Sequence, residues 1–272
     1  MDRRTTPFSG RIAHVSLKGR IDAPLTEGEA ASVGPALADL LARPDGPRDR
    51  QVIHGEALTV IDRQDGHAHV MAAKDGYCGW LPEAALAPAF APTHHVRTPA
   101  THLYAGPKAQ SPALMPLYLG ARVVVTGIEG KWAQTPRGYI PAMHLAPIGD
   151  HAEDPVAVAE TFLHTPYCWG GNSAAGIDCS GLAQAALLAA GIPCPGDSDL
   201  QQAIGQPIPE GAPLRRGDLI FWKGHVALMT APDRIIHANG GTMSVAHEGL
   251  QEALARIEAQ GEGGLVARRR PR

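Results

Sequence analysis

Three residues in the second half of the chain have the types and spacing needed for nucleophilic chemistry. Cys179 stands between an aspartate and a serine in the stretch YCWGGNSAAGIDCSGLAQAALLAAG. A cysteine attacks as its thiolate, and it needs a base to take its proton and a third group to orient that base. His225 begins the run HVALM, and His237 lies in the following run RIIHANG. These two histidines are the candidates for the base and the orienting group.

The residues around Cys179 predict a helix over 179–191 that begins at the cysteine itself. Asp178 can cap this helix, and Gly191 followed by Pro193 can end it. The first turn of a helix has free backbone N–H groups, which lower the pKa of a thiol and can hold an oxyanion. We therefore expect the position of Cys179 to activate it.

Three short runs bounded by turn residues predict strands at 217–224, 225–231 and 234–241. The turn APDR separates the last two, so His225 and His237 are expected to lie side by side across an antiparallel sheet. His225 would then take the thiol proton, and His237 would fix the tautomer of His225. Further helices are predicted over 154–165, capped by Asp154, and over 250–261. Helices combined with an antiparallel sheet indicate an α+β domain.

Each of these residues taken alone also has an ordinary structural explanation. A cysteine at a helix start is commonly a buried small residue. A histidine in a strand is commonly hydrogen-bonded or exposed. The combination of DCSGL, the strand pair GDLIFWKGHVALM and HA in the next strand favours catalysis over these explanations.

Composition limits the other functions that the chain could have. The 272 residues carry a net charge of −3, which predicts no nucleic-acid partner. The basic tail ARRRPR is interpreted as a solvated terminus. No apolar run reaches the roughly 20 residues of a membrane helix, and no secretory signal is predicted. The four cysteines show no metal-binding spacing, and free thiols predict a cytoplasmic protein.

The first half of the chain contains an internal repeat. GWLPEAALAP at 79–88 matches GYIPAMHLAP at 138–147, and GEALTVID at 55–62 matches GARVVVTG at 120–127. Short β-branched runs with frequent turn signals are typical of small β-barrels. We place two such barrels at 36–90 and 96–149, after an N-terminal arm of residues 1–35 and before a C-terminal domain of residues 150–272.

These motifs carry a resemblance to known families. The repeated unit resembles the bacterial SH3-like domain. Residues 155–248 resemble the NlpC-type cell-wall peptidases, a papain-like cysteine peptidase family, through TPYCWGG, IDCSGL, RRGDLIFWKGHVALM and IIHANGG. The resemblance implies Cys179 as nucleophile, His225 as base and His237 as third member. It also places Tyr167 near the nucleophile, either as a hydrogen-bond donor to the oxyanion or as an aromatic wall.

The whole arrangement resembles the γ-D-glutamyl-L-diamino acid endopeptidases of murein recycling, of the dipeptidyl-peptidase VI type. That subgroup cleaves L-Ala-γ-D-Glu–diamino acid peptides, and it requires a free N-terminal L-Ala. The resemblance implies that Asp178, Ser180 and Ser198 contact the substrate, although Asp178 would also be explained as a helix cap. Family members often carry Arg where this chain has Gly196. A carboxylate clamp from this loop is therefore in doubt.

In the same subgroup the first SH3-like domain lends an acid and a tyrosine to the cleft. The counterparts here would be Asp49 and Tyr77, with Glu83 as a further candidate for the ammonium site. An exposed loop acid and a barrel-core aromatic are the alternative explanations for Asp49 and Tyr77.

The sequence thus predicts a cytoplasmic cysteine peptidase that hydrolyses the γ-D-glutamyl–diamino acid bond of released murein peptides. No cofactor or metal, no nucleic acid and no membrane partner is expected, and the oligomeric state and the preferred diamino acid are left open. An amidase or acyltransferase using the same three residues is one alternative. A non-catalytic module that binds wall peptides is the other.

Overall fold

The computed structural model describes residues 1–271, which form two compact units, one ending at Ile148 and the other starting at Gly149. The N-terminal segment of the first unit contains β1 (Ala13–His14), the 3₁₀-helix Val15–Leu17 and β2 (Leu25–Thr26). It is held in place by Arg11, whose guanidinium hydrogen-bonds the buried carboxylate of Asp62 at 2.8 Å.

Two β-domains make up the rest of the first unit. The first is a seven-stranded sheet of order β5-β4-β8-β7-β6-β3-β9. Its strands are β3 (Glu29–Val33), β4 (Leu37–Leu41), β5 (Arg48–Ile53), β6 (Ala57–Gln64), β7 (His67–Ala72), β8 (Cys78–Pro82) and β9 (Leu86–Pro88). Because β3 pairs with both β6 and β9, this sheet starts inside the expected arm of residues 1–35, and the arm is shorter than predicted.

The second β-domain has a three-stranded sheet, β13-β10-β17, and a five-stranded sheet, β12-β11-β16-β15-β14. Its strands are β10 (His94–Val96), β11 (Ala100–Tyr104), β12 (Ala113–Tyr118), β13 (Arg122–Val123), β14 (Gly127–Glu129), β15 (Trp132–Thr135), β16 (Gly138–Pro141) and β17 (Leu145–Pro147). Apolar side chains from both sheets, among them Val96, Leu103, Leu117 and Ile140, form its core. Each β-domain therefore has a core of its own.

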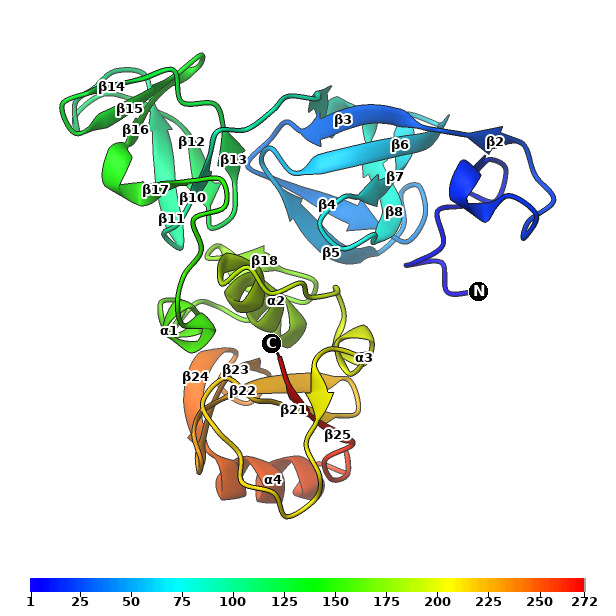
Figure 1. The fold of residues 1–272 in the computed structure, drawn as a ribbon, viewed down its shortest axis with the longest axis vertical. Coiled ribbons are helices and arrows are strands. Elements are labelled where there is room, and N and C mark those ends of the chain that lie inside the picture. The colour runs from blue at the N-terminus through cyan, green and yellow to red at the C-terminus, as the bar shows by residue number, and fades with distance from the viewer. Residues whose placement is uncertain (272) are drawn as a thin grey trace. The chain divides into compact units, whose positions relative to one another are not determined.

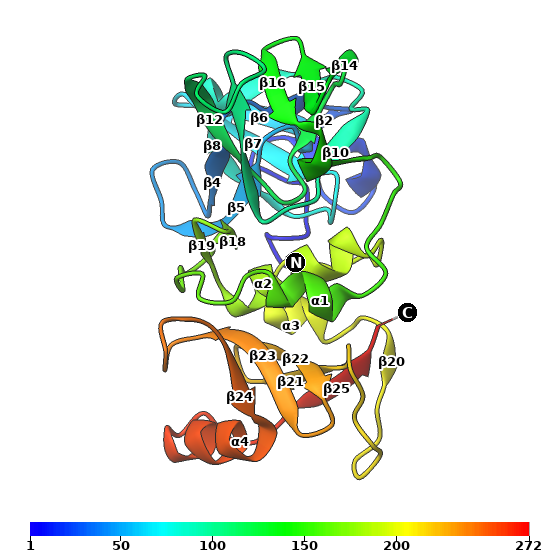
Figure 2. The same ribbon diagram turned by 90° about the vertical axis from the view of Figure 1, so that its left-hand side faces the viewer.

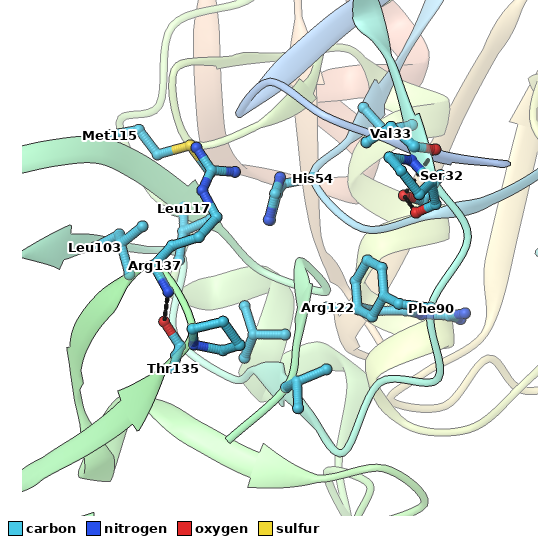
Figure 3. Close-up of a pocket in the computed structure, with 15 residues that line it drawn as sticks. Ser32, Val33, His54, Phe90, Leu103, Met115, Leu117, Arg122, Thr135 and Arg137 are labelled. Atoms are coloured by element: carbon cyan, nitrogen blue, oxygen red, sulfur yellow. Dashed lines mark hydrogen bonds between the residues drawn. The ribbon is translucent and has the colours of Figure 1, made fainter. Parts of the chain in front are cut away.

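The two β-domains are joined directly by a backbone hydrogen bond of 3.0 Å from Arg122 N–H to the carbonyl of His54. A cavity of about 260 Å³ lies beside this junction. Figure 3 shows its walls, with Val33 and His54 from the first β-domain and Leu117 and Arg137 from the second. The cavity belongs entirely to the first unit.

The second unit is an α+β domain built on one antiparallel sheet of order β20-β25-β21-β22-β23-β24 (Figure 1). The strands are β20 (Gln206–Pro207), β21 (Leu219–Trp222), β22 (His225–Ala231), β23 (Arg234–Asn239), β24 (Ser244–Gly249) and β25 (Ala267–Arg270). The helices are α1 (Pro155–Glu160), α2 (Cys179–Ala189), α3 (Ser198–Gln201) and α4 (Leu250–Ala259), and β18 (Asn172–Ser173) pairs with β19 (Gly176–Ile177) just before α2. The predicted fold class is confirmed.

Helices cover both faces of this sheet, with α1 and α2 on one side and α4 on the other (Figure 2). Successive residues of a strand point to opposite faces. Ile220 and Trp222 of β21 accordingly pack with Ile257 of α4, whereas α2 lies against β22 and β23. The sheet is thus buried on both sides, which explains why β21 and β22 are almost continuously apolar.

The basic tail is not the solvated terminus that the sequence indicated. Residues 267–270 form β25, which lies between β20 and β21 in the sheet. The guanidinium of Arg270 donates hydrogen bonds to both oxygens of the buried Asp218, at 2.7 and 2.8 Å. A run of arginines is therefore accommodated in the sheet because one of them neutralises a buried carboxylate. Among residues 1–271, no helix is long and apolar enough to cross a membrane.

Candidate active site

The candidate nucleophile Cys179 is the first residue of α2, as predicted from the sequence. Asp178 caps the helix: its Oδ1 accepts hydrogen bonds from the N–H of Gly181 at 2.6 Å and the hydroxyl of Ser180 at 2.9 Å. Its Oδ2 accepts the N–H of Gly170 at 2.9 Å. One carboxylate therefore fixes both the start of the helix and the glycine loop before it. Both oxygens of Asp178 are used in this way, which favours the cap over direct substrate contact.

The glycines around the cysteine are required by close backbone approach. A Cβ on Gly181 would lie 2.4 Å from the carbonyl oxygen of Gly171, and one on Gly171 would lie 2.4 Å from the carbonyl oxygen of Gly176. Contacts this short exclude any side chain. The same Gly171 carbonyl accepts the N–H of Asp178 at 3.1 Å. The loop can therefore press against the first turn of α2 and hold Cys179 at its tip.

The thiol of Cys179 lies against β22. Its sulfur is near the backbone N–H groups of Val226, the residue after His225, and of Ser180 and Cys179 itself. These N–H groups lower the pKa of the thiol, as expected for a helix N-terminus. Burial and the nearby charge of Asp178 outweigh them and raise the pKa of Cys179 to about 12.

The structure brings the two predicted histidines together. Nε2 of His225 lies 2.9 Å from Nδ1 of His237, with the ring centres 5.1 Å apart. Burial lowers the pKa of His225 to about 3 and that of His237 to about 4, so both rings are neutral at pH 7. His225 is partly accessible and His237 is completely buried. The outer ring is thus placed to react and the inner ring to orient it.

Tyr167 is half-buried near the thiol. Burial, together with the charges of Cys179 and Asp178, raises the pKa of the Tyr167 phenol, so its hydroxyl keeps its proton and can donate. The backbone of Tyr167 is held by a 2.9 Å hydrogen bond from its N–H to the carbonyl of Met243. This geometry is compatible both with an oxyanion donor and with an aromatic wall.

Ser180 and Ser198 are both buried, in α2 and α3. Gln201 of α3 ties the two segments together: its side-chain amide donates to the carbonyl of Ser180 at 2.9 Å and to those of Pro195 and Gly196 at 3.1 and 3.2 Å. Gln201 was missed in the sequence because nothing in SDLQ marks a glutamine that reaches three carbonyls. It sets the position of the loop that carries Ser198.

Asp49, Tyr77 and Glu83 lie in the first unit and have partners there. The guanidinium of Arg3 pairs with Asp49, with one contact at 2.8 Å. Tyr77 is buried in the core of the first β-domain, and the guanidinium of Arg50 lies 5.2 Å from the centre of its ring. Glu83 is 3.5 Å from Arg63. The core-aromatic explanation fits Tyr77, and the carboxylate of Asp49 is already paired.

Two further charged residues adjoin the histidines. Oε2 of Glu248, in β24, lies 3.0 Å from Nε2 of His237. Arg256 of α4 binds the same carboxylate through Nε at 2.9 Å and Nη2 at 2.8 Å. Sequence reasoning missed both residues, because β24 was not predicted and LQEALARIEAQ reads as an ordinary exposed helix. Among residues 1–271, no cluster of three or more histidine, cysteine or acidic side chains is arranged to hold a metal ion.

Comparison with known protein families identifies the domain that contains this site. Residues 164–256 match the NlpC/P60 family, and residues 40–86 match the family described as the bacterial dipeptidyl-peptidase SH3 domain. The C-terminal domain belongs to the NlpC/P60 family. The NlpC/P60 match includes Cys179 and both histidines, and the SH3 match lies within the first β-domain. Neither of these two matches extends into the second β-domain, so the prediction of a second SH3-like copy stays a prediction.

Curated relatives of this chain include dipeptidyl-peptidases. Dipeptidyl-peptidase 6 of Lysinibacillus sphaericus is 37% identical over 125 residues, which cover 42% of this chain and 45% of that protein. A gamma-D-glutamyl-L-lysine dipeptidyl-peptidase of Bacillus cereus is 28% identical over 230 residues, which cover 72% of this chain and 69% of that protein. The chain thus spans less than half of the first relative and about two thirds of the second.

A solved structure supports the fold. The crystal structure of an NlpC/P60 family protein from Bacillus cereus ATCC 10987 superposes with a TM-score of 0.75 at 22% identity, covering 89% of this chain and 99% of that one. At this identity the likeness concerns the fold. It is consistent with an NlpC/P60 domain that follows β-rich domains in the same chain.

Proposed function

We propose that this NlpC/P60 protein is a cysteine peptidase that hydrolyses the γ-D-glutamyl–diamino acid bond of murein peptides with a free N-terminal L-Ala. The observation that carries the proposal is the placement of Cys179 at the start of α2, which packs against the strands that carry the hydrogen-bonded pair of His225 and His237. The name of the Bacillus cereus relative, a gamma-D-glutamyl-L-lysine dipeptidyl-peptidase, supports the choice of bond.

The first half of the reaction forms an acyl-enzyme. His225 takes the thiol proton through Nδ1, the nitrogen that does not face His237, while the sulfur of Cys179 attacks the γ-carbonyl carbon. The oxyanion is held by the backbone N–H of Cys179 at the helix start, and the hydroxyl of Tyr167 is the candidate for a second donor. The C–N bond then breaks, and the departing amino group of the diamino acid takes the proton from His225.

The second half releases the product. Water gives a proton to His225 and attacks the thioester carbon, and the C–S bond breaks. The proton returns to the sulfur, so that L-Ala-D-Glu leaves and the free thiol is restored. Because both histidines are neutral at rest, one ring can take up and return the proton in each half of the cycle.

The test is a cleavage assay read by mass spectrometry, with three substrates. These are L-Ala-γ-D-Glu-meso-diaminopimelate with a free α-amine, the same peptide acetylated, and intact murein. We expect cleavage of the free peptide alone, giving L-Ala-D-Glu and diaminopimelate. Cleavage of all three would contradict the requirement for a free N-terminus, and cleavage of none would favour an amidase, an acyltransferase or a binding module.

A Cys179→Ala variant tests whether the Cys179 thiol is the nucleophile. It removes the sulfur and leaves the backbone N–H groups of α2 in place, so the circular dichroism spectrum should be unchanged while turnover disappears. Cys168→Ala, which changes a neighbouring thiol, should remain active. Retained cleavage by Cys179→Ala would rule out the nucleophile.

A further inference from the structure

His237 is held on both sides of its ring. Its Nδ1 faces Nε2 of His225 at 2.9 Å, and its Nε2 lies 3.0 Å from Oε2 of Glu248. The ring N–H does not point straight at this oxygen, so the contact is a bent hydrogen bond between the neutral ring and the charged carboxylate. Four groups therefore form a chain of successive contacts. They are the base His225, His237, the Glu248 carboxylate and the Arg256 guanidinium, which donates two hydrogen bonds to that carboxylate.

Strand register explains how Glu248 reaches the buried histidine. His237 of β23 pairs with Ala246 of β24. Side chains two residues apart on a strand share a face, so Glu248 is the diagonal neighbour of His237 across the ladder. The helix α4 starts immediately after β24, and its Arg256 comes back to bind Glu248 in a bidentate pair. The carboxylate is thereby fixed between a strand and a helix.

The possible hydrogen positions follow from the types of group in this line. The Arg256 guanidinium holds the pKa of Glu248 below its usual range, so the carboxylate is ionised and can only accept. The neutral His237 must then carry its hydrogen on Nε2 and present a bare Nδ1. Since that nitrogen can only accept, His225 must carry its hydrogen on Nε2. The other nitrogen of His225, Nδ1, is left bare.

We propose that Glu248 is a positioning residue that sets the tautomers of both His237 and His225, and so keeps Nδ1 of the base free to take the thiol proton. Arg256 supports it by keeping the carboxylate charged and fixed in place. When His225 takes the proton, the negative charge of Glu248 also stabilises the imidazolium through the intervening ring. The effect on turnover rests on the proposed function, but the tautomers themselves do not.

Glu248→Met is the informative variant because it removes both carboxylate oxygens and keeps the length of the side chain. Glutamine is less informative, because Oε2 of Glu248 faces both His237 and Nη2 of Arg256, and an amide oxygen in that place would preserve the tautomer. With methionine, the hydrogen-bonding group nearest to Nε2 of His237 is the Arg256 guanidinium, which only donates. Nε2 must then be bare, so His237 carries its hydrogen on Nδ1, and His225 accepts at Nε2 and carries its own hydrogen on Nδ1, where it blocks proton transfer from the thiol.

The first measurement is histidine ¹⁵N NMR at pH 7, which reports the tautomer of each ring without any substrate. We expect His225 and His237 to be Nε2–H in the parent protein and Nδ1–H in Glu248→Met. Glu252→Met, in the exposed first turn of α4, is the control and should leave both tautomers unchanged. Unchanged tautomers in Glu248→Met would overturn the proposal.

The second measurement is steady-state cleavage of the murein tripeptide. Glu248→Met should lower kcat by about 10- to 100-fold with little change in KM, because outer groups act through the ligand or base that they orient. Full activity of Glu248→Met would overturn the proposal. A tautomer switch in a protein that cleaves no murein peptide would support the positioning role and refute only the proposed function.

An Arg256→Met variant keeps the proposal testable if Glu248→Met does not fold. It leaves the Glu248 carboxylate and removes the cation that keeps it ionised. Besides Arg256, the charged or titratable groups that face this carboxylate are His237, with His225 behind it, and Glu262, which interacts with Arg256 just beyond α4. The pH below which kcat/KM falls should therefore be higher in Arg256→Met than in the parent protein. An unchanged pH profile of kcat/KM would contradict the role of the carboxylate.

Discussion

The Cys179 thiol lies near the backbone N–H of Val226, at the start of β22 and one residue from His225. The helix that carries the nucleophile thus packs against the strand that carries the base. The thiol is buried at this place, where the uncharged form is preferred. The thiol and the His225 imidazole are therefore both neutral at pH 7.

The ionisation of Cys179 can be followed by its alkylation rate. Its pKa is raised to about 12 by burial, so the thiolate fraction should grow with pH across the whole accessible range. We expect the rate of Cys179 carbamidomethylation by iodoacetamide, measured by mass spectrometry, to rise from pH 5 to pH 9.5 without a plateau. N-acetylcysteine provides the reference rate at each pH. A plateau reached below pH 7 would instead mean a preformed thiolate–imidazolium pair.

The buried histidines make the domain sensitive to acid. Both have folded-state pKa values, about 3 and about 4, below the unfolded value of 6.5, so the unfolded chain binds more protons between these limits. The stabilisation is complete above pH 6.5 and is lost as the pH falls, at up to about 1.4 kcal/mol per pH unit for each histidine. Urea unfolding between pH 4.5 and 6.5 should show a shallower pH dependence for His237→Gln. The exposed His151→Gln variant should keep the parent slope.

Local signals were enough to predict the elements that carry the reacting residues. Asp178 before an apolar run and Gly191 after it mark a helix by capping alone, and α2 ends within two residues of the predicted position. The turn residues between β21, β22 and β23 likewise separate three strands whose apolar character is continuous. The α+β class, confirmed here, follows from these short-range patterns.

Long-range pairing could not be predicted in the same way. Glu248 lies in β24, whose sequence SVAHEG has little strand character apart from its pairing with β23. Arg270 enters the sheet because Asp218, 52 residues earlier, needs a cation. The burial that raises the pKa of Cys179 is likewise a tertiary property. Each of these depends on a partner whose proximity only the folded chain reveals.

Tyr167→Phe separates the two explanations for this tyrosine. If the protonated hydroxyl donates to the oxyanion, its removal should lower kcat for the murein tripeptide by about 100-fold with little change in KM. If the ring is only a wall of the cleft, phenylalanine supplies the same surface and kcat should stay within about twofold. Steady-state kinetics decide between the two, and thermal unfolding should be unchanged in both cases.

Gly181→Ala tests how closely the glycine loop packs on the first turn of α2. Alanine in place of glycine within a helix ordinarily adds about 1 kcal/mol of stability. Here the new Cβ would lie 2.4 Å from the Gly171 carbonyl oxygen and 2.9 Å from Oδ1 of Asn172, so the loop must move. We expect the sign to reverse, with a loss of about 1–3 kcal/mol in the free energy of unfolding by urea. Activity should fall as well, because the displaced carbonyl also holds the N–H of Asp178. A more stable Gly181→Ala protein would show that this contact is looser than the structure indicates.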